Sequence, residues 1–337
     1  MEIQIESVSE LGRELFFRIE PEPVFAEREK IVEEFRRQAE IEGFRKGKAP
    51  ACLVETRYGQ AIEEQLLKKL IPAAYLEGIR QHNLAVITDP EISEVKLDRE
   101  GLRFKVYVEV KPEVSVKKYL GLTLKKVEPE PVTDEMVDQI LKEWEKRPEL
   151  AVSIIDPEKR RAWRQRIREQ LETMARNRAR AAEEKQIWDQ LLQEARFPVP
   201  EKLVRERARH YTEEELKRQN LQGKSEKEIR RLAEEIFEKV KPKGEEDVRK
   251  YFILEKVAEL EGVGCNQEEL NARIQHIARV VGEPEEEVRQ KLEKAGRLEE
   301  LQNEIRLDKT FGLILEKAQV ISRVILPGET SGNAVRT

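Results

Sequence analysis

The segment GFRKGKAP, residues 43–50, holds the residues best suited to binding chemistry. It combines an aromatic ring with three cations and two glycines: Gly43, Phe44, Arg45, Lys46, Gly47 and Lys48. An exposed aromatic ring can supply apolar burial at an interface, and an arginine can form a charge-assisted bond with a carboxylate or a phosphate. The segment is therefore a candidate docking loop at the surface of the protein.

The same segment also has a purely structural interpretation. Gly43 would end a helix in the left-handed conformation, and Phe44 would fold back on the last helical turn. The nearby cations would favour a helix C-terminus, and Pro50 would begin the next helix. Residue spacing alone leaves both interpretations open.

Catalytic and cofactor-binding patterns are missing from the sequence. The three histidines, His82, His210 and His276, are isolated, and none has a metal-ligand spacing such as HExxH. There is no GxSxG or Walker A motif, and GVGCNQ at 262–267 lacks the third glycine of a dinucleotide-binding loop. The sequence therefore predicts no catalytic residue, metal, cofactor or nucleotide-driven cycle.

Composition limits the classes of partner. Charged residues make up 39% of the 337 residues, but 63 Lys and Arg against 68 Asp and Glu give a net charge of -5, which argues against wholesale nucleic-acid binding. The N-terminus has no signal-peptide pattern, and no run of about 18 apolar residues occurs. We expect a cytoplasmic protein without a membrane partner.

Hydrophobic periodicity predicts an α+β domain followed by helices. Alternating residues within 3–19 and 102–110 indicate antiparallel strands, and helical spacing indicates helices at 24–42, ending at Gly43, and at about 50–79. Residues 112–131 are too rich in proline and β-branched residues for a helix.

Capping signals mark the helices of the second half. Thr133 begins a short helix, and everything after Asp156 is expected to be helical up to the tail, with further starts at Ser225 and Asn266. We predict an elongated chain in which an extended linker joins the α+β domain to an all-α domain with arm-like projections. The four predicted segments are 1–111, the linker at 112–150, the helical domain at 151–326 and a flexible tail at 327–337.

Three segments resemble the trigger factor family of bacterial ribosome-associated chaperones. GFRKGKAP with Arg-Tyr-Gly at 57–59 is similar to the ribosome-binding signature of that family, and the likeness continues through VYVEVKPEV at 106–114 and FPVPEKLV at 197–204. The resemblance covers nearly the whole chain. It implies that Phe44, Arg45 and Lys46 dock onto a ribosomal protein beside the tunnel exit, with contacts to ribosomal RNA.

One departure from the family pattern changes the expected activity. Typical members carry a prolyl-isomerase domain of roughly a hundred residues between the linker helix and the helical domain. Here only RPELAVSII, residues 147–155, stands at that place. We therefore predict a chaperone without prolyl-isomerase activity.

The expected function is that of an ATP-independent holdase, which shields nascent and unfolded polypeptides at the ribosome. Charged helices that carry scattered apolar side chains could bind unfolded segments weakly and release them without nucleotide. The predicted contact residues are Leu221, Phe237, Leu298, Leu301 and Ile305. The alternative for each is packing between helices.

Two other functions stay open at this point. The first is a ribosome-independent chaperone or assembly factor, acting as a homodimer off the ribosome in which the docking domain closes the partner's cradle. The second is an RNA-binding scaffold built on residues 158–185, which hold ten bases and five acids. Apolar residues such as Trp163 and Ile167 favour a packed amphipathic helix there instead.

Overall fold

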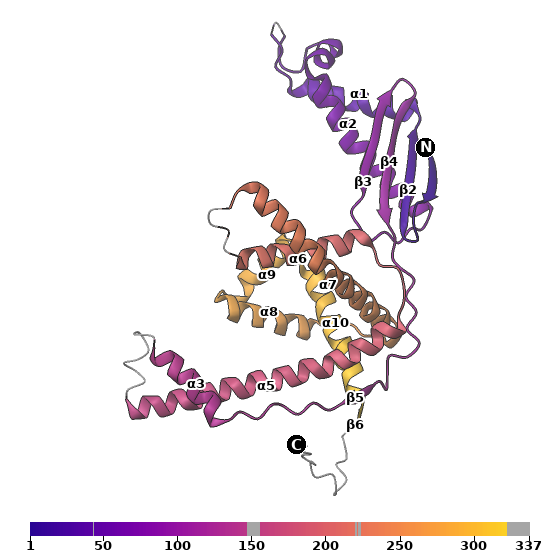
Figure 1. The fold of residues 1–337 in the computed structure, drawn as a ribbon. Helices are drawn as coiled ribbons and strands as arrows, with labels where there is room; N and C mark the ends of the chain where they lie inside the picture. Colours follow the sequence, from indigo (N-terminus) through magenta and orange to yellow (C-terminus); the bar gives the residue numbers. More distant parts are fainter. Residues whose placement is uncertain (43, 147–155, 220, 222–223, 322–337) are drawn as a thin grey trace. The chain divides into compact units, whose positions relative to one another are not determined.

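A computed structural model of the chain describes residues 1–42, 44–146, 156–219, 221 and 224–321. The chain forms two compact units, and each is built from two stretches of the sequence (Figure 1). The first unit comprises Met1–Glu113 and Phe197–Arg249, and the second comprises Val114–Arg196 and Lys250–Thr337. The boundary at Arg249 falls within one long helix, α7.

An antiparallel sheet forms the centre of the N-terminal α+β fold, with strands in the order β1-β2-β4-β3 (Figure 1). The strands are β1 Glu2–Ser7, β2 Gly12–Ile19, β3 Glu91–Asp98 and β4 Gly101–Glu109. Alternation in β2 and β4 places apolar side chains on one face, where Phe17 lies opposite Phe104. The β3–β4 turn requires glycine, because Gly101 has φ +109° and a Cβ there would lie 2.0 Å from the Ile19 carbonyl oxygen.

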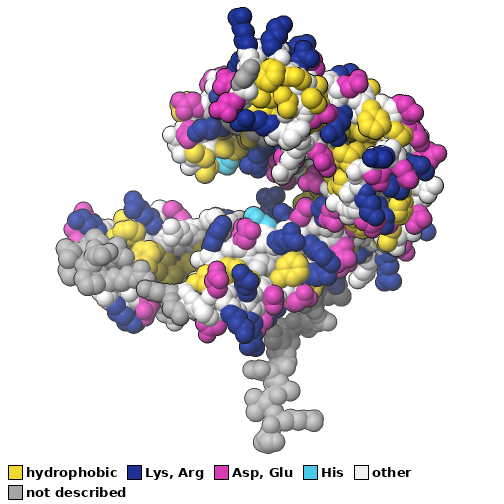
Figure 2. Space-filling model, turned by 90° about the horizontal axis from the view of Figure 1, so that it is seen from above, with side chains coloured by type: hydrophobic (Ala, Val, Ile, Leu, Met, Phe, Trp, Pro, Cys, Tyr) yellow, Lys and Arg dark blue, Asp and Glu magenta, His cyan; other side chains and the backbone are white. Residues whose placement is uncertain are grey.

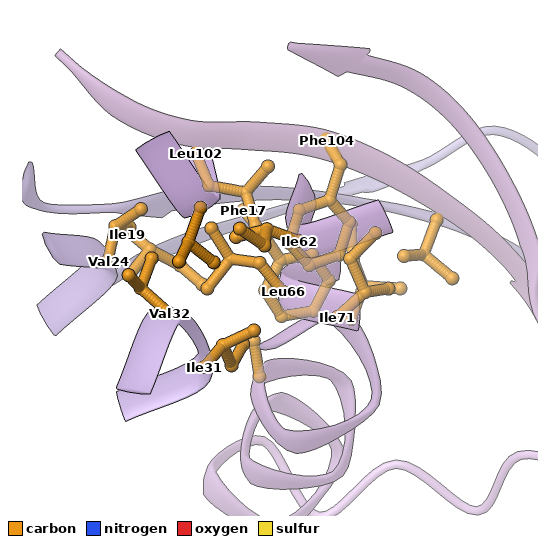
Figure 3. Packing of buried hydrophobic residues seen from close by; sticks show 14 of the residues in the cluster. Phe17, Ile19, Val24, Ile31, Val32, Ile62, Leu66, Ile71, Leu102 and Phe104 are labelled. Atoms are coloured by element: carbon orange, nitrogen blue, oxygen red, sulfur yellow. The ribbon is translucent and has the colours of Figure 1, made fainter. Parts of the chain in front are cut away.

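Two helices, α1 Pro21–Gln38 and α2 Ala51–Gln81, cover the apolar face of this sheet. Figure 3 shows Ile31 of α1 and Ile62 and Leu66 of α2 pointing toward the strands. The rings of Phe17 and Phe104 stack at 4.7 Å between their centroids within the same core. This core fixes the two helices that bear the candidate docking loop between them.

The first unit also contains helices from later in the chain, α6 Glu201–Arg218 and the first part of α7 Glu226–Glu261. The N-terminus of α6 is capped by a residue of β4. The buried carboxylate of Glu109 accepts the backbone N–H groups of Glu201, at 3.1 Å, and of Lys202, at 3.0 Å. A carboxylate at a helix N-terminus satisfies free N–H groups and complements the helix dipole, so β4 holds the start of α6.

The second unit is built mainly of helices (Figure 1). Besides the end of α7, its elements are β5 Thr123–Lys125, α3 Asp134–Glu145, α5 Pro157–Glu194, α8 Gln267–Val281, α9 Glu285–Lys294, α10 Leu298–Glu316 and β6 Gln319–Ile321. Val137 and Leu141 of α3 pack with Ile167 of α5, and α8, α9 and α10 share a separate apolar cluster. The predicted fold class, an α+β N-terminal part followed by a largely helical part, is confirmed.

Side-chain amides of α5 bind the backbone of the strand β5. Gln190 accepts the Thr123 N–H at 3.1 Å and donates to the Thr123 carbonyl at 2.7 Å. Gln186, one helical turn earlier, makes the same two bonds with Lys125, each at 2.9 Å. These two glutamines therefore act as a neighbouring strand for one edge of β5, while β6 pairs in parallel with the other edge.

The helix starts predicted from capping signals are confirmed, whereas the first helix begins at Pro21 and not at residue 24. The Thr133 hydroxyl accepts the Met136 N–H, and the Asp156 carboxylate accepts the Glu158 N–H at 2.9 Å. Asn266 and Glu269 form a reciprocal capping box at the start of α8. One expectation is wrong: the second half of the chain is not all helical, because residues 319–321 form β6 on the strand β5.

The functional boundaries at 111, 150 and 326 stay a prediction. Residues 147–155, the expected tail at 327–337 and Gly43 lie outside the described residues. Among the described helices, none combines the length and the apolar composition that crossing a membrane requires.

Candidate docking site

The docking loop, residues 39–50, joins α1 to α2 and begins earlier than predicted. Helix α1 ends at Gln38, not next to Gly43. Ala39 leaves the helix with ψ 135°, and its N–H donates to the Phe35 carbonyl at 2.7 Å. Residues 35–38 thus form the last turn of α1, and the docking loop begins at Ala39.

Both ends of the docking loop are fixed by the core. Ile41 packs against the buried cluster of the N-terminal fold, and Ala49 is only 3% exposed within that cluster. Pro50 then precedes the first residue of α2. Because these anchors hold the ends, the side chains from Phe44 to Lys48 are presented on a short span of chain.

A tight turn forms the tip of the docking loop. The Lys48 N–H donates to the Arg45 carbonyl at 2.9 Å, and Gly47 has φ +80°, as at the third position of a type II turn. A side chain at Gly47 would be strained at this φ. The turn places Arg45 and Lys46 at its exposed corner, and Figure 1 shows the loop projecting beyond α1 and α2.

The Phe44 ring is not sealed inside the protein. Its exposed fraction is 42%. It lines a shallow depression, here called the docking hollow, whose residues are Glu40, Ile41, Glu42, Phe44, Lys46 and Arg57. A helix that ended at Gly43 would have let the ring fold back on its last turn, but α1 ends at Gln38.

The cations of the docking loop are largely uncompensated. Lys46 lies 3.9 Å from Glu40, and both side chains are well exposed, so this ion pair contributes little. Arg45 and Lys48 make no ion pair with any residue that the structure describes. The arrangement offers an exposed ring and free positive charge to an anionic, partly apolar surface.

The basic run at 158–185 has a different environment. Seven of its ten bases form ion pairs: Arg160, Arg164, Arg168, Arg176, Arg178, Arg180 and Lys185. Arg164, for example, contacts Asp134 at 3.0 Å as well as Asp138. Ile167 is buried against α3, as the packed-helix interpretation predicts. Lys159, Arg161 and Arg166 form no ion pair with any described residue, so the run offers RNA less free charge than its ten bases indicate, but not none.

Five residues were predicted to contact unfolded polypeptides (clients), and two of these five are buried. Leu301 is 7% exposed and Ile305 is 5% exposed, and both pack among α8, α9 and α10. Leu298 is half-buried against the same cluster. We correct the prediction for Leu301 and Ile305, because a side chain inside this cluster cannot contact a client while the helices stay packed.

Phe237 lies instead in an apolar depression of the helix pair α6 and α7. This hairpin hollow is lined by Arg209, Thr212, Glu213, Leu216, Ala233, Glu234, Phe237 and Glu238. Its floor is mainly apolar, and its acidic rim residues Glu213, Glu234 and Glu238 form no ion pair within the described part of the chain. Leu221, half-buried, belongs to the connection between the two helices.

Sequence analysis missed Leu216 and Ala233 as partners of Phe237. They follow helical spacing, Leu216 in α6 and Ala233 one turn before Phe237 in α7, but nothing local to either segment says that the two helices pair. On the face seen in Figure 2, cationic and anionic side chains are interspersed with hydrophobic patches. Among the described residues, no group of His, Cys, Asp and Glu has the arrangement of a metal site.

Comparison with known proteins gives matches along most of the chain. A family model described as "Bacterial trigger factor protein (TF)" matches residues 1–144, and one described as "Bacterial trigger factor protein (TF) C-terminus" matches residues 161–316. The two matches leave residues 145–160 between them.

Curated relatives match over a shorter stretch. "Trigger factor" of Citrifermentans bemidjiense is 37% identical over 148 residues, which is 44% of this chain and 34% of the relative. "Trigger factor" of Geobacter sp. (strain M21) is 38% identical over the same length and coverage. The matched stretch thus spans about a third of the length of these relatives.

A solved structure supports the fold over a longer stretch. It is described as "Promiscuous Substrate Recognition in Folding and Assembly Activities of the Trigger Factor Chaperone", and the match covers 94% of this chain and 100% of that one. The TM-score is 0.57 at 17% sequence identity, so the likeness concerns the fold.

Proposed function

This chain belongs to the trigger factor family of chaperones, and we propose that it acts as an ATP-independent holdase that docks at the ribosomal tunnel exit. Its partners are ribosomal protein and RNA beside the exit, together with nascent and unfolded polypeptides. Its compartment is the cytoplasm. No nucleotide is needed, because weak apolar contacts of a few hundred Å² release clients on their own.

The docking loop carries the ribosome-binding part of this proposal. Phe44 keeps 42% of its surface exposed next to Arg45, whose charge has no partner among the described residues. Aromatic side chains and arginine are the residue types enriched at the energetic centre of interfaces, so an exposed ring beside an unpaired arginine at a tight turn fits a partner surface. Docking then raises the effective concentration of chaperone at the emerging chain.

The hairpin hollow is the proposed client contact in the first unit. Phe237, Leu216 and Ala233 supply an apolar floor, which suits the side chains of an unfolded segment. Leu221 and Leu298, which are half-buried, stay weaker candidates. Leu301 and Ile305 serve instead as core residues of α10.

We also propose that the chain has no prolyl-isomerase activity. The support is the distance along the chain: residues 145–160, between the two matched family models, are too few to fold as a domain with a proline-binding pocket. A proline-isomerisation assay on a model tetrapeptide tests this. A rate above the uncatalysed one would contradict it.

Ribosome co-sedimentation tests the docking assignment. The triple variant Phe44→Ala, Arg45→Ala, Lys46→Ala is expected to lose co-sedimentation while suppressing aggregation of an unfolded protein as well as wild type does. A matched control removes the same residue types from α1, as Phe25→Ala, Arg28→Ala, Lys30→Ala, where Phe25 and Lys30 are exposed and Arg28 is half-buried. Wild-type ribosome binding by the docking-loop variant, or equal loss in both variants, would contradict the assignment.

Variants of two apolar residues test the client contact. Phe237→Ala is expected to weaken suppression of aggregation with little change in stability, because Phe237 lines an open depression. Leu301→Ala is expected to cost about 2–5 kcal/mol of stability by leaving a cavity in the cluster of α8–α10. The proposal fails if Phe237→Ala suppresses aggregation normally at a temperature where it is fully folded. Dimerisation stays a prediction, which light scattering over a concentration series tests.

A further inference from the structure

The strand β1 lies at an edge of the four-stranded sheet, with β2 on one side and no described strand on the other (Figure 1). Its six residues pair with β2 without a register shift. The strand contains no proline, lysine or bulge, the features that commonly protect an exposed edge from pairing with another chain. This edge of the sheet is therefore open to a further strand.

The register shows which backbone groups face the open edge. The Val8 N–H donates to the Gly12 carbonyl at 3.1 Å, and this pair continues the β1–β2 register. Directly opposite residues of an antiparallel pair alternate between those that exchange hydrogen bonds and those that do not. The even-numbered residues of β1 thus bond to β2, while the N–H and C=O groups of Ile3, Ile5 and Ser7 face outward.

The opposite edge of the same sheet is protected. The strand β3 changes register between Ser93 and Lys96, and Glu94 within this bulge has φ +51°. A bulge twists an edge strand and interrupts its row of N–H and C=O groups. Of the two edges, β1 is therefore the one that presents a regular row of backbone donors and acceptors.

The outward face of β1 and β2 is acidic along this edge. The even-numbered residues of the two strands include Glu2, Glu6 and Glu14, which form no ion pair with any described residue, against the single cation Arg18 opposite Glu2. Glu6 lies directly opposite Glu14, and like charges at such a position repel. A strand with Lys or Arg on this face would reduce the repulsion.

The inward face of β1 is apolar. Ile3 and Ile5 are half-buried against the core, so each keeps part of its side chain open at the edge of the sheet. A second copy of β1 would not fit beside them. Two such strands paired antiparallel about Gln4 would place Glu2 of each copy directly opposite Glu6 of the other, which is unfavourable.

We propose that the open edge of β1 binds an extended segment of an unfolded polypeptide as a fifth, antiparallel strand, and that this segment alternates apolar residues with Lys or Arg. The inference rests on the proposed function, which brings unfolded polypeptides to this chain. Backbone hydrogen bonds to Ile3, Ile5 and Ser7 give affinity for any extended sequence, and the alternation gives preference. The apolar residues extend the inward face, and the cations lie beside Glu2 and Glu6.

A fluorescent seven-residue peptide that alternates Lys and Val tests the proposal on the full-length chain, with binding followed by anisotropy. It should bind about tenfold more tightly at low salt than a peptide that alternates Glu and Val. It should also slow hydrogen exchange of the Ile3, Ile5 and Ser7 N–H groups, measured by NMR, whereas the Gln4 N–H is bonded to β2 without it. Glu2→Lys with Glu6→Lys should invert the preference between the two peptides.

N-methylated peptides test the direction of the hydrogen bonds. In an antiparallel strand beside Ile3 and Ile5, the Val N–H groups face β1 and the Lys N–H groups face away. Methylation of every Val nitrogen should therefore abolish binding, whereas methylation of the Lys nitrogens should leave the affinity within about threefold. Equal affinities of the two methylated peptides would overturn the proposal.

A variant of β1 gives the complementary test. Ile5→Pro removes one outward N–H and no bond to β2, and it should weaken peptide binding about tenfold. The matched control Ile5→Ala loses the same side chain but keeps the N–H, and it should bind within about twofold of wild type. Equal losses in the two variants would overturn the strand pairing. If Ile5→Pro does not fold, the methylated peptides decide on the wild-type chain.

The outcomes separate this inference from the proposed function. If the wild-type chain fails to suppress aggregation of an unfolded protein, the proposed function fails and the strand addition fails with it. If it suppresses aggregation but the Lys-Val peptide leaves the N–H groups of Ile3 and Ile5 unprotected, only the strand addition is overturned. Protection that rises with chain concentration in the absence of peptide would assign the edge to a second copy and overturn the proposal.

Discussion

The docking loop and helix α5 are both rich in Lys and Arg, but their charges have different surroundings. Most bases of α5 contact an acid on the same helix or on the segment that packs against it, such as Arg180 with Glu184 at 2.9 Å. In the docking loop, Arg45 is exposed and forms no ion pair with any described carboxylate. The comparison teaches that available charge depends on pairing, which a count of bases along a sequence does not measure.

Charge reversal in the docking loop should produce the largest effect. Arg45→Glu with Lys46→Glu places like charges against an anionic surface, so ribosome affinity is expected to fall by about 100-fold or more. Ribosome binding followed by anisotropy of a labelled chain measures this. Reversal of two paired α5 residues, Arg178→Glu with Arg180→Glu, should leave the affinity within about twofold. Equal losses would break the comparison.

Removal of the buried carboxylate of Glu109, which accepts two backbone N–H bonds, should have the second-largest effect. Glu109→Ala removes the cap of α6 and leaves the N–H groups of Glu201 and Lys202 without their acceptor, at a cost of about 2–3 kcal/mol in unfolding free energy. Glu109→Gln keeps one acceptor oxygen and should cost about half as much. Chemical denaturation gives both values. A neutral Glu109→Ala would mean that water replaces the carboxylate at this helix end.

Freeing paired cations on α5 should have a smaller effect. Asp134→Ala with Asp138→Ala removes the partners of Arg164 and of Arg168 and lowers stability by about 1 kcal/mol, since the pairs are exposed. The two freed guanidinium groups should raise affinity for a single-stranded RNA oligomer a few-fold at low salt. Gel-shift titration measures this affinity. The control is Glu143→Ala, which frees only the exposed Lys146 at the C-terminal end of α3. Unchanged RNA affinity would show that ion pairing is not the reason why α5 binds RNA weakly.

Lowering the pH should have the smallest effect, a loss of stability shared among several carboxylates. The Ser225 hydroxyl and N–H hold the pKa of Glu228 below its usual value, and Lys309 and the Asn266 N–H lower the pKa of Glu269. Because both pKa values are lower in the folded chain, the stabilisation is present above the unfolded value of about 4.3 and is lost as pH falls through the folded values. Thermal unfolding from pH 7 to 3 measures it. Glu228→Gln with Glu269→Gln should show a shallower decline.

Local sequence signals predicted most helices and strands. Contacts between residues far apart in the sequence could not be predicted in this way. Thr133, Asp156 and Asn266 marked helix starts correctly because each cap bonds within three residues. The cap that Glu109 gives to Glu201 crosses 92 positions, and no spacing rule reports it. The three-residue strand β6 was missed for the same reason.

The candidate sites divide in the same way. The docking loop was predicted from the identity of its residues, while its exposure depended on where α1 ends, five residues before Gly43. Phe237 and Leu301 both stand among charged neighbours on amphipathic helices, so the sequence could not tell an open depression from a closed cluster. Whether each side chain is open or buried depends on the helices that pack against its own helix, and the sequence pattern does not identify these.

The two glutamines of α5 that bind β5 give the second unit a junction of a different kind. An amide neither gains nor loses a proton across the physiological range, and ions in solution screen it little. Gln186 and Gln190 therefore keep Thr123 and Lys125 attached to the helix in brine or mild acid, where the surrounding ion pairs weaken. Backbone amides at these two positions should exchange slowly with heavy water, although the strand that contains them is only three residues long.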